Sequence, residues 1–333
     1  MPIPEKASIF AHHFLPAQIS MTIKFPARLR QGDLIGLVAP ASPLDDTGRV
    51  ERGVRYLEGL GYRTLVAPHV SQRVGYLAGT DKQRADDLHA MFTDRRVKAI
   101  FCVRGGYGSP RLLRALNYRL IARHPKIFVG YSDITALLLA LWSECSLVSF
   151  HGPMAGVEMA GSMDPVTEES FWRILTDASS GMGLGAGTVL TDGRGPRRPV
   201  RGRLIGGNLS LCASLVGTAY QPDFLRSILF LEDIGEEPYR IDRMVTQLRN
   251  AGIFSRVTAV VLGSFTNCVP NDASSPSLSV DEIMRENAAM TGKPHATGFP
   301  FGHEEHFVTF PVGVRANLDL KSGKLELLEA AVA

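Results

Sequence analysis

Hydrophobic positions in the first half of the chain form short apolar runs that alternate with segments of helical periodicity. A short apolar run bounded by turn residues predicts a buried strand, and apolar residues three or four positions apart predict an amphipathic helix. On this basis we expect strands over 34–39, 62–67, 99–103 and 127–129, and helices over 49–60, 80–92 and 111–120. Such alternation is typical of a parallel, doubly wound sheet.

Around residues 163–201 glycine and proline interrupt this alternation, and only residues 168–176 predict a helix there. Farther along we expect strands over 202–205, 228–231 and 257–265, helices over 208–215, 241–251 and 279–290, and a hairpin within 307–328. A chain of 333 residues also exceeds one ordinary hydrophobic core. We therefore predict an α/β protein in four parts: an extension (1–21), an N-terminal α/β domain (22–165), a linker (166–200) and a smaller mixed α/β domain (201–333).

The composition narrows the classes of partner. A net charge of +3 is small for this length, and basic residues are scattered except over 194–203, so no nucleic-acid-binding stripe is expected. No apolar run approaches the roughly 18 residues of a membrane span, and the first twenty residues lack an apolar signal-peptide core. The four cysteines lie far apart without zinc-type spacing, which suits a reducing compartment. We therefore expect a cytoplasmic protein that binds neither nucleic acid nor membrane.

The strand expected over 127–129 runs into Gly130-Tyr-Ser-Asp and then into a strongly apolar helical segment. A strand, a tight turn with serine at its apex and a helix form the geometry of a nucleophile elbow. Gly130 lacks a Cβ atom, so the chain can turn sharply beside it. The turn would expose the Ser132 hydroxyl at the carboxyl edge of the sheet, where the N–H groups of the following helix face developing negative charge. Ser132 is therefore our candidate nucleophile.

A helix cap is the simpler alternative for the same residues. Ser132 and Asp133 are both ordinary capping residues at a strand-to-helix junction. The motif also departs from Gly-x-Ser-x-Gly, because Ile134 occupies the position of the last glycine. The motif alone leaves both hypotheses open.

A second loop, Arg104-Gly-Gly-Tyr-Gly, directly follows an expected strand. In open α/β sheets, ligands bind where several strands end at the carboxyl edge, which brings this loop and Ser132 together. The N–H of Asp133, with that of Gly105 or Gly106, can then form an oxyanion hole. The loop lacks the last glycine of Gly-x-Gly-x-x-Gly and no Lys-Ser/Thr follows, so both nucleotide-binding motifs fail.

A serine nucleophile needs a base and a group that orients the base. Of the nine histidines, His303 lies in a Gly/Pro-rich loop whose backbone can hold a ring in place, and His151 follows an expected strand in His-Gly-Pro-Met. Both are candidate bases. Glu232 ends the apolar run Ile228-Leu-Phe-Leu and is the candidate carboxylate, unless it is only a solvated strand end.

The segment His303-Glu-Glu-His306 raises the alternative of a zinc site. The helical zinc motif places its histidines four residues apart, and Pro300 and Gly302 disfavour a helix here. We therefore predict no metal and no cofactor.

Taken together, these motifs resemble the L,D-carboxypeptidase family of serine peptidases, also called muramoyltetrapeptide carboxypeptidases. The resemblance extends from about residue 32 to residue 319, and the order and spacing of its short motifs are specific. Phe310-Pro-Val-Gly stands where Leu-Pro-Leu-Gly is more usual. The motifs are Gly32-Asp-Leu-Ile-Gly-Leu-Val-Ala-Pro-Ala-Ser, Arg104-Gly-Gly-Tyr-Gly, Gly130-Tyr-Ser-Asp-Ile-Thr, His151-Gly-Pro-Met, Gly206-Gly-Asn-Leu-Ser, Leu231-Glu-Asp, Gly302-His and Phe310-Pro-Val-Gly.

The resemblance implies a flavodoxin-like N-terminal domain, a smaller C-terminal α/β domain, a site in the cleft between them and a homodimer. It implies a triad, which falls on Ser132, His303 and Glu232. The implied reaction removes the terminal D-alanine of a cytoplasmic murein tetrapeptide during cell-wall recycling.

The mechanism expected from these residue types needs two further kinds of group. The backbone N–H groups of Asp133 and Gly106 would stabilise the tetrahedral oxyanion. Arg104 is a candidate to bind the terminal carboxylate, because a guanidinium can donate two parallel hydrogen bonds to a carboxylate. The alternative is that Arg104 is an exposed structural arginine. Tyr107, in the same loop, is a second candidate substrate-binding residue.

Two other functions fit the same scaffold. A microcin C immunity peptidase shares the triad but cleaves an aminoacyl or peptidyl nucleotide, and it needs an aromatic side chain to stack on adenine. Phe171 or Trp172 is the candidate for that contact, with helix packing as the alternative role of both. A non-catalytic ligand-binding protein is the second possibility, and its function would survive Ser132→Ala.

Overall fold

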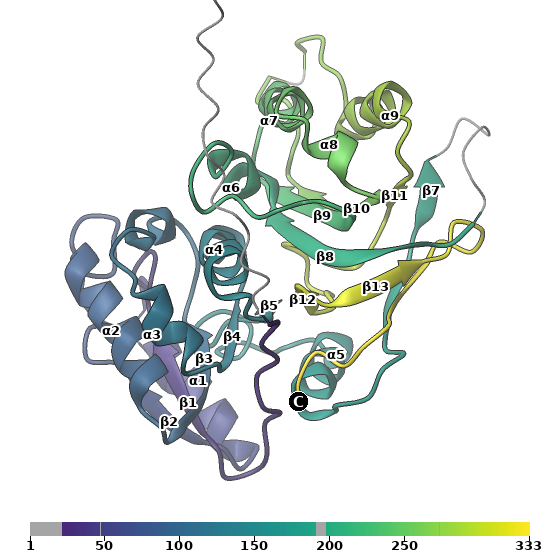
Figure 1. The fold of residues 1–333 in the computed structure, drawn as a ribbon. Helices are drawn as coiled ribbons and strands as arrows, with labels where there is room; N and C mark the ends of the chain where they lie inside the picture. Colours follow the sequence, from purple (N-terminus) through teal and green to yellow (C-terminus); the bar gives the residue numbers. More distant parts are fainter. Residues whose placement is uncertain (1–21, 47, 191–197, 273) are drawn as a thin grey trace, which may run out of the picture.

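The computed structural model describes residues 22–46, 48–190, 198–272 and 274–333 (Figure 1). The extension expected over 1–21 and part of the expected linker therefore lie outside the described residues. Two β-sheets organise the rest, and helices pack against both (Figure 1). This arrangement confirms the predicted α/β fold class.

Six strands of the described chain form the first sheet, in the order β12-β5-β4-β3-β1-β2. Strands β1 to β5 pair in parallel, and their order 2-1-3-4-5 is that of a flavodoxin-like sheet. Strands β1, β4 and β5 are buried on both faces, as parallel strands between helices require, and β1 and β4 consist of apolar residues and glycine. The strands are β1 (Leu34–Val38), β2 (Arg63–Val66), β3 (Val97–Cys102), β4 (Ile127–Gly130), β5 (Ser149–His151) and β12 (Phe310–Val312).

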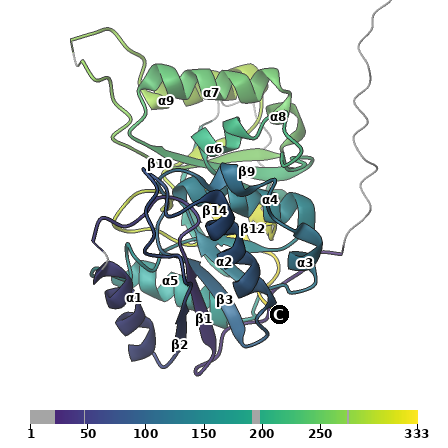
Figure 2. The same cartoon turned by 90° about the vertical axis from the view of Figure 1, so that its left-hand side faces the viewer.

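Helices cover both faces of this sheet (Figure 2). Two of them, α1 (Gly48–Gly59) and α5 (Pro165–Thr176), lie on one face and meet where the Trp172 Nε1 donates to the Tyr56 hydroxyl at 2.8 Å. The opposite face carries α2 (Asp81–Thr93), α3 (Tyr118–Ala122) and the buried helix α4 (Thr135–Cys145), with the short 3₁₀ turns η1 (Ser109–Leu112) and η2 (Ser132–Ile134) between them.

The second sheet has eight strands in the described residues, in the order β6-β14-β13-β8-β9-β10-β11-β7. Its centre is parallel and its outer strands are antiparallel, which makes it a mixed sheet. The strands are β6 (Gly183–Ala186), β7 (Thr188–Leu190), β8 (Val200–Asn208), β9 (Ser227–Ile234), β10 (Ala259–Thr266), β11 (His295–Thr297), β13 (Arg315–Leu318) and β14 (Lys324–Leu327). Above it lie α6 (Leu209–Ser214), α7 (Pro238–Asn250), α8 (Ile253–Arg256) and α9 (Val280–Thr291), as Figure 1 shows.

Strand β12 connects the two halves of the chain. It follows the second-sheet strands β6 to β11 in sequence, yet it pairs antiparallel with β5, so that Phe310 lies opposite His151. Pro311 cannot donate to a ladder, which suits the edge position of this strand. The first sheet is therefore completed by a segment from the last part of the chain.

Two local predictions are wrong. The single helix expected over 111–120 is instead η1 followed by α3, because the Asn117 side chain accepts the Leu120 N–H at 3.0 Å and starts a new helix. Glu232 does not end its strand, since β9 continues to Ile234. The segment expected as a linker contains α5, β6 and β7, and the division of the chain into domains stays a prediction.

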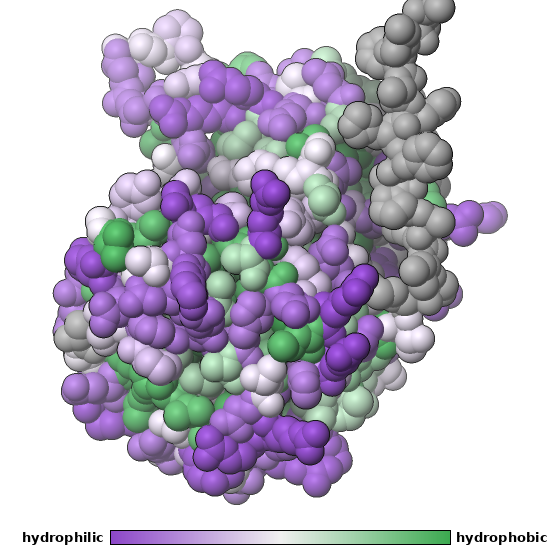
Figure 3. All heavy atoms as spheres, turned by 60° about the vertical axis from the view of Figure 1, so that its left-hand side comes forward, coloured by the Kyte–Doolittle hydropathy of each residue, from purple (hydrophilic) through white to green (hydrophobic). Residues whose placement is uncertain are grey.

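Among the described residues, no helix is both long and apolar enough to cross a membrane. On the face shown in Figure 3, hydrophilic residues predominate and hydrophobic residues gather in small separate groups.

Candidate active site

The turn after β4 has the backbone geometry of a nucleophile elbow. Ser132 has φ +62°, a left-handed conformation that is uncommon for a residue with a side chain and is typical of functional sites. Gly130 is required beside it, because a Cβ there would lie 2.8 Å from Cγ2 of Ile134. The backbone therefore holds the Ser132 side chain in place at the carboxyl end of the strand.

The helix-cap alternative is wrong for these residues. Ile134 is the N-cap of α4, and neither it nor Tyr131, the N-cap of η2, makes a side-chain capping hydrogen bond. The Asp133 carboxylate instead accepts the backbone N–H groups of Gly108 at 3.2 Å and Ser109 at 2.7 Å. Asp133 thus ties the glycine-rich loop to the elbow and leaves Ser132 free of a capping role.

The loop over residues 104–108 packs directly against the elbow. A Cβ on Gly105 would lie 3.0 Å from Cβ of Ser132 and 3.3 Å from its Oγ. Gly106 has φ +104°, and a Cβ there would lie 2.6 Å from Oγ of Ser42. Within the described residues, neither the Gly106 N–H nor the Asp133 N–H donates to a protein acceptor. Two glycines are therefore required to bring this backbone so close to the serine.

The second sheet supplies an ion pair between the predicted carboxylate and one predicted base. Nδ1 of His303 lies 2.7 Å from Oε2 of Glu232, although the two residues are 71 positions apart. The Glu232 side chain is completely buried and the His303 side chain is 14% exposed. Gly302 permits this approach, because it has φ +116° and a Cβ there would lie 3.0 Å from Cβ of Glu232.

Neighbouring carboxylates on β9 have different partners because side chains alternate along a strand. Asp233 accepts hydrogen bonds from Asn208 and from the N–H and hydroxyl of Ser210, and so it fixes the start of α6. Glu232 is left to His303. Burial raises the pKa of Glu232, and the hydrogen bond from His303 opposes this rise. Burial alone would lower the pKa of His303, but the Glu232 carboxylate raises it above its ordinary value.

Two contacts bring the pair next to the elbow. The His303 ring lies 5.0 Å, centroid to centroid, from the ring of Tyr131, the residue before Ser132. On β8, Asn208 lies opposite Glu232, and its N–H donates to the Thr135 hydroxyl at the start of α4 at 3.1 Å. The Ser132 carbonyl accepts the Thr135 N–H, but its hydroxyl makes no hydrogen bond to another described residue. Catalytic hydrogen bonds are often long or absent before substrate binds.

His151, the second candidate base, has no such environment. Its side chain is completely buried, and neither ring nitrogen has a hydrogen-bond partner among the described residues. Burial lowers the pKa of His151 to about 3, so the ring is neutral. Without a carboxylate to orient it, His151 lacks the partner that a triad base requires.

The two histidines of His303-Glu-Glu-His306 point to different partners. Nδ1 of His306 lies 2.8 Å from the Asp164 carboxylate at the start of α5, whereas His303 contacts Glu232. Among the described residues, no group of three or more His, Cys, Asp or Glu side chains converges as metal ligands would. All four cysteines are buried free thiols.

The remaining predicted site residues flank the elbow. Nη1 of Arg104 donates to the Pro43 carbonyl at 3.0 Å, and its side chain stays about one third exposed. Tyr107 is half exposed and forms an edge-on pair with Tyr76, whose ring centroid lies 5.4 Å away. The rings of Phe171 and Trp172 are packed against other side chains. Phe171 is completely buried, and Trp172 stacks on Tyr62 at 5.0 Å.

One group near His303 has no recognisable signal in the sequence. The Tyr131 hydroxyl donates to Oε1 of Glu158 at 2.7 Å. Glu158 belongs to no motif that we singled out, and no spacing rule marks it. Only the folded contact identifies it.

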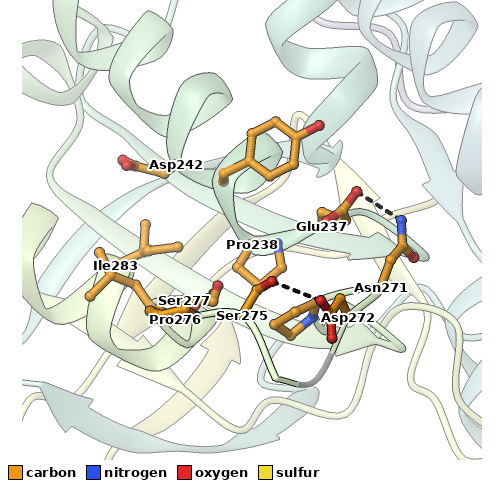
Figure 4. Close-up of a pocket in the computed structure, with 12 residues that line it drawn as sticks. Glu237, Pro238, Asp242, Asn271, Asp272, Ser275, Pro276, Ser277 and Ile283 are labelled. Carbon is orange, nitrogen blue, oxygen red and sulfur yellow. Dashed lines mark hydrogen bonds between the residues drawn. The ribbon is translucent and has the colours of Figure 1, made fainter.

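A separate cavity of about 400 Å³ lies beyond the carboxyl ends of β9 and β10 (Figure 4). Its polar groups are partly paired, since Asn271 donates to Glu237 at 2.8 Å and Ser275 to Asp272 at 3.0 Å. None of Ser132, Glu232 and His303 lines it. The described residues that line it include serine hydroxyls and carboxylates but no histidine, lysine or cysteine, so we do not assign the chemistry to it.

Two family models match the chain. A family model described as the LD-carboxypeptidase N-terminal domain matches residues 35–152, and one described as the LD-carboxypeptidase C-terminal domain matches residues 201–318. Together the two cover more than half of the chain. The chain belongs to the LD-carboxypeptidase family. It is therefore a hydrolase of the serine carboxypeptidase type, as the motifs predicted.

Individual LD-carboxypeptidase relatives cover nearly the whole chain. A probable murein peptide carboxypeptidase of Bacillus subtilis is 37% identical over 92% of this chain and 95% of its own length. The crystal structure of a muramoyltetrapeptide carboxypeptidase from Oxalobacter formigenes has a TM-score of 0.79 and 32% identity, covering 88% of this chain and 97% of that one. The microcin C7 self-immunity protein, a protein of Escherichia coli, is also similar. Its structure in complex with aspartyl sulfamoyl adenosine has a TM-score of 0.83 and 26% identity, covering 93% of this chain and 100% of that one.

Proposed function

We propose that this carboxypeptidase releases the terminal D-alanine of murein tetrapeptides by a triad of Ser132, His303 and Glu232. The observation that carries the proposal is the buried Glu232–His303 contact of 2.7 Å beside a serine held at φ +62°. A serine with a base, and a carboxylate that orients the base, are the parts that acyl transfer requires. The names of the murein-processing relatives support the substrate class.

In the proposed reaction, Nε2 of His303 removes the proton from the Ser132 hydroxyl as Oγ attacks the amide carbonyl before D-alanine. Glu232 accepts the Nδ1–H bond, which fixes the tautomer and stabilises the imidazolium. The imidazolium then protonates the leaving amine of D-alanine, and an acyl-enzyme remains. Water, deprotonated by His303, hydrolyses this ester and restores Ser132.

The groups around the serine have matching roles in this proposal. The N–H groups of Asp133 and Gly106 stabilise the oxyanion, and the loss of one such donor typically costs about 3–4 kcal/mol of transition-state stabilisation. Arg104 binds the terminal carboxylate with the part of its guanidinium that the Pro43 contact leaves exposed. Tyr107 contributes an exposed ring at the same edge.

The test is D-alanine release from murein tetrapeptide by wild type and Ser132→Ala, with chelator present. We expect chelator-resistant release by the wild type and none by the variant. Release that persists in Ser132→Ala would refute the nucleophile assignment. Release that requires added metal would refute the triad mechanism.

A microcin-type nucleotide substrate is the second candidate, and the similarity to the self-immunity protein bound to aspartyl sulfamoyl adenosine favours testing it. The predicted adenine partners, Phe171 and Trp172, are packed against α1 and the first sheet and do not support it. Incubation with aspartyl sulfamoyl adenosine separates the two functions. Cleavage of this compound without release of D-alanine would favour the immunity-type activity.

We also propose a cytoplasmic location and a homodimer, as the family resemblance implies. Cell fractionation and light scattering of the purified protein test these two expectations. A monomer at assay concentration that retains full activity would contradict a role for the dimer in catalysis.

A further inference from the structure

Tyr131 connects the proposed base to a second carboxylate. Its ring lies 5.0 Å from the His303 ring at an interplanar angle of 61°. Its hydroxyl donates to Oε1 of Glu158 at 2.7 Å. Tyr131 is itself buried, with 6% of its surface exposed. One side chain next to the nucleophile therefore contacts both His303 and Glu158.

Glu158 is fixed in this position by the turn that carries it. Its other oxygen, Oε2, accepts the Met154 N–H at 2.8 Å. The turn is docked on the end of β3, because the N–H groups of Ala155 and Gly156 donate to Cys102 and Val103. Gly156 makes this possible, since a Cβ there would lie 2.6 Å from the Val103 carbonyl oxygen.

The contacts of Glu158 suit a carboxylate. Each oxygen accepts one donor, the Tyr131 hydroxyl or the Met154 N–H, and a carboxylate is acceptor-only. Burial raises the pKa of Glu158, and these two donors and the nearby His303 oppose the rise. Both carboxyl oxygens are therefore occupied as acceptors, as the ionised form allows.

His303 is then placed between negative groups from both sheets. Among the described residues, Glu232 alone contacts a ring nitrogen of His303, and Asp233 is occupied by the start of α6. Glu158 approaches from the first sheet, behind the Tyr131 ring. The titratable groups that face His303 are Glu232, Asp233, Glu158, His151 and Tyr131.

We propose that Glu158 is a positioning residue: through Tyr131 it sets the place of the His303 ring, and its charge supports the imidazolium that forms during catalysis. This inference rests on the proposed triad. Glu158 touches neither the substrate nor the reacting atoms in this proposal. It acts on His303 through the contact with Tyr131 and through the electric field of its carboxylate.

The protein contains a matched control for this pair. The Tyr56 hydroxyl donates to Oε1 of Glu168 at 2.5 Å, so a second, half-buried Tyr–Glu pair joins α1 to α5 away from the elbow. The experiment compares Glu158→Gln and Tyr131→Phe with Glu168→Gln and Tyr56→Phe. Glu158→Gln removes the charge and keeps one acceptor for the tyrosine, while its amide nitrogen replaces the oxygen that accepts the Met154 N–H. Tyr131→Phe keeps the ring and removes only the link.

The first readout is an NMR titration of histidine-labelled protein, with the His303 signal assigned by His303→Gln. In Glu158→Gln the pH midpoint of His303 should fall by roughly 0.5–1, the effect of one nearby, partly screened charge. In Tyr131→Phe, kcat should fall roughly threefold to tenfold with KM unchanged, the size of one lost hydrogen bond. Both control variants should match the wild type in titration and rate.

The acid limb of kcat/KM for D-alanine release is the second readout, and it should move with the NMR midpoint. A His303 midpoint at the wild-type pH in Glu158→Gln would overturn the proposal, as would equal rate losses in the control pair. If Glu158→Gln does not fold, the Tyr131→Phe variant decides the question, and unchanged kinetics in that variant would overturn the proposal. If no D-alanine is released at all, the proposed function fails, but the NMR midpoint still decides the role of Glu158.

Discussion

The two sheets build their parts of the site by different means. The first sheet uses backbone geometry, with Ser132 at φ +62° and Gly106 at φ +104° packed closely together. The second sheet uses buried charge, with Glu232 and His303 held by a hydrogen bond of 2.7 Å and little exposure to solvent. A substitution in the first region should act through shape, and one in the second through protonation.

The turn of the first sheet and the ion pair of the second sheet also differ in how well a short sequence motif predicts them. A strained turn needs glycine at fixed positions, so Gly130 and Gly106 mark it within a few residues. A buried ion pair needs only two side chains that meet in the fold, and 71 positions separate Glu232 from His303. Four substitutions test whether the first sheet acts through shape and the second through charge.

The largest effect is expected for the base. His303→Ala should lower kcat/KM for D-alanine release by about 10⁵-fold, because a triad without its base retains only binding and oxyanion stabilisation. His306→Ala is the matched control, since its exposed ring pairs only with Asp164. It should stay within about twofold of the wild type, as is usual for a surface substitution. Similar losses in both variants would contradict the role of His303.

Glu232→Gln should follow, with kcat lower by roughly 10³–10⁴-fold. The base must be neutral to act, so kcat/KM rises with pH through the His303 pKa, which Glu232 holds above its ordinary value. Removing this carboxylate lowers that pKa, and the acid limb should move to lower pH by roughly 1–3 pH units. A pH–rate profile of the variant checks this prediction. An acid limb at the wild-type pH would contradict the role of the Glu232 charge in raising the pKa of His303.

Shape should dominate in the glycine-rich loop. In Gly106→Ala the new Cβ would lie 2.6 Å from Oγ of Ser42, and we expect kcat/KM to fall by about 100-fold as one oxyanion donor moves. Gly75→Ala is the control, because it also has positive φ but has no atom within 4 Å of the new Cβ. Both should lower the free energy of unfolding by about 1 kcal/mol, but only Gly106→Ala should slow the reaction.

The smallest effect concerns stored strain. Ser132→Gly should raise the free energy of unfolding by roughly 0.5–1 kcal/mol, because glycine adopts positive φ without the Cβ clash. Ser146→Gly, at φ +51° after α4, should give a similar gain in a denaturant titration. Only Ser132→Gly should abolish D-alanine release. A loss of stability in Ser132→Gly alone would mean that its side chain, rather than the backbone, holds the turn.

Local patterns predicted the first sheet well for a physical reason. Buried parallel strands are continuous apolar runs, and helices with clear caps separate them, as Thr80 caps α2 by accepting the Gln83 N–H. The parallel, doubly wound sheet and the elbow geometry both follow from such short segments, whereas the flavodoxin-like domain was expected from the family resemblance. The helix expected over 111–120 failed because Asn117 caps a new helix inside an apolar stretch.

Contacts between distant segments were not predictable in the same way. Strands β6 and β7 lie in a glycine-rich segment, which has too few side chains to show the alternation of apolar and polar residues that predicts a strand. Glu158 contacts Tyr131, 27 residues away, only after the turn that carries Glu158 packs on the end of β3. The Glu232–His303 contact needed the family resemblance, because the residues alone left His151 as an equal candidate.

Strand β12 has a consequence for the order in which the protein is made. During synthesis, β1 to β5 leave the ribosome long before β12 exists. The nascent first sheet therefore presents β5 as an open edge, which other unfinished chains can pair with. When β12 closes that edge, the segment carrying His303 has already emerged. The sheet that holds the serine is thus completed only after its proposed base has been synthesised.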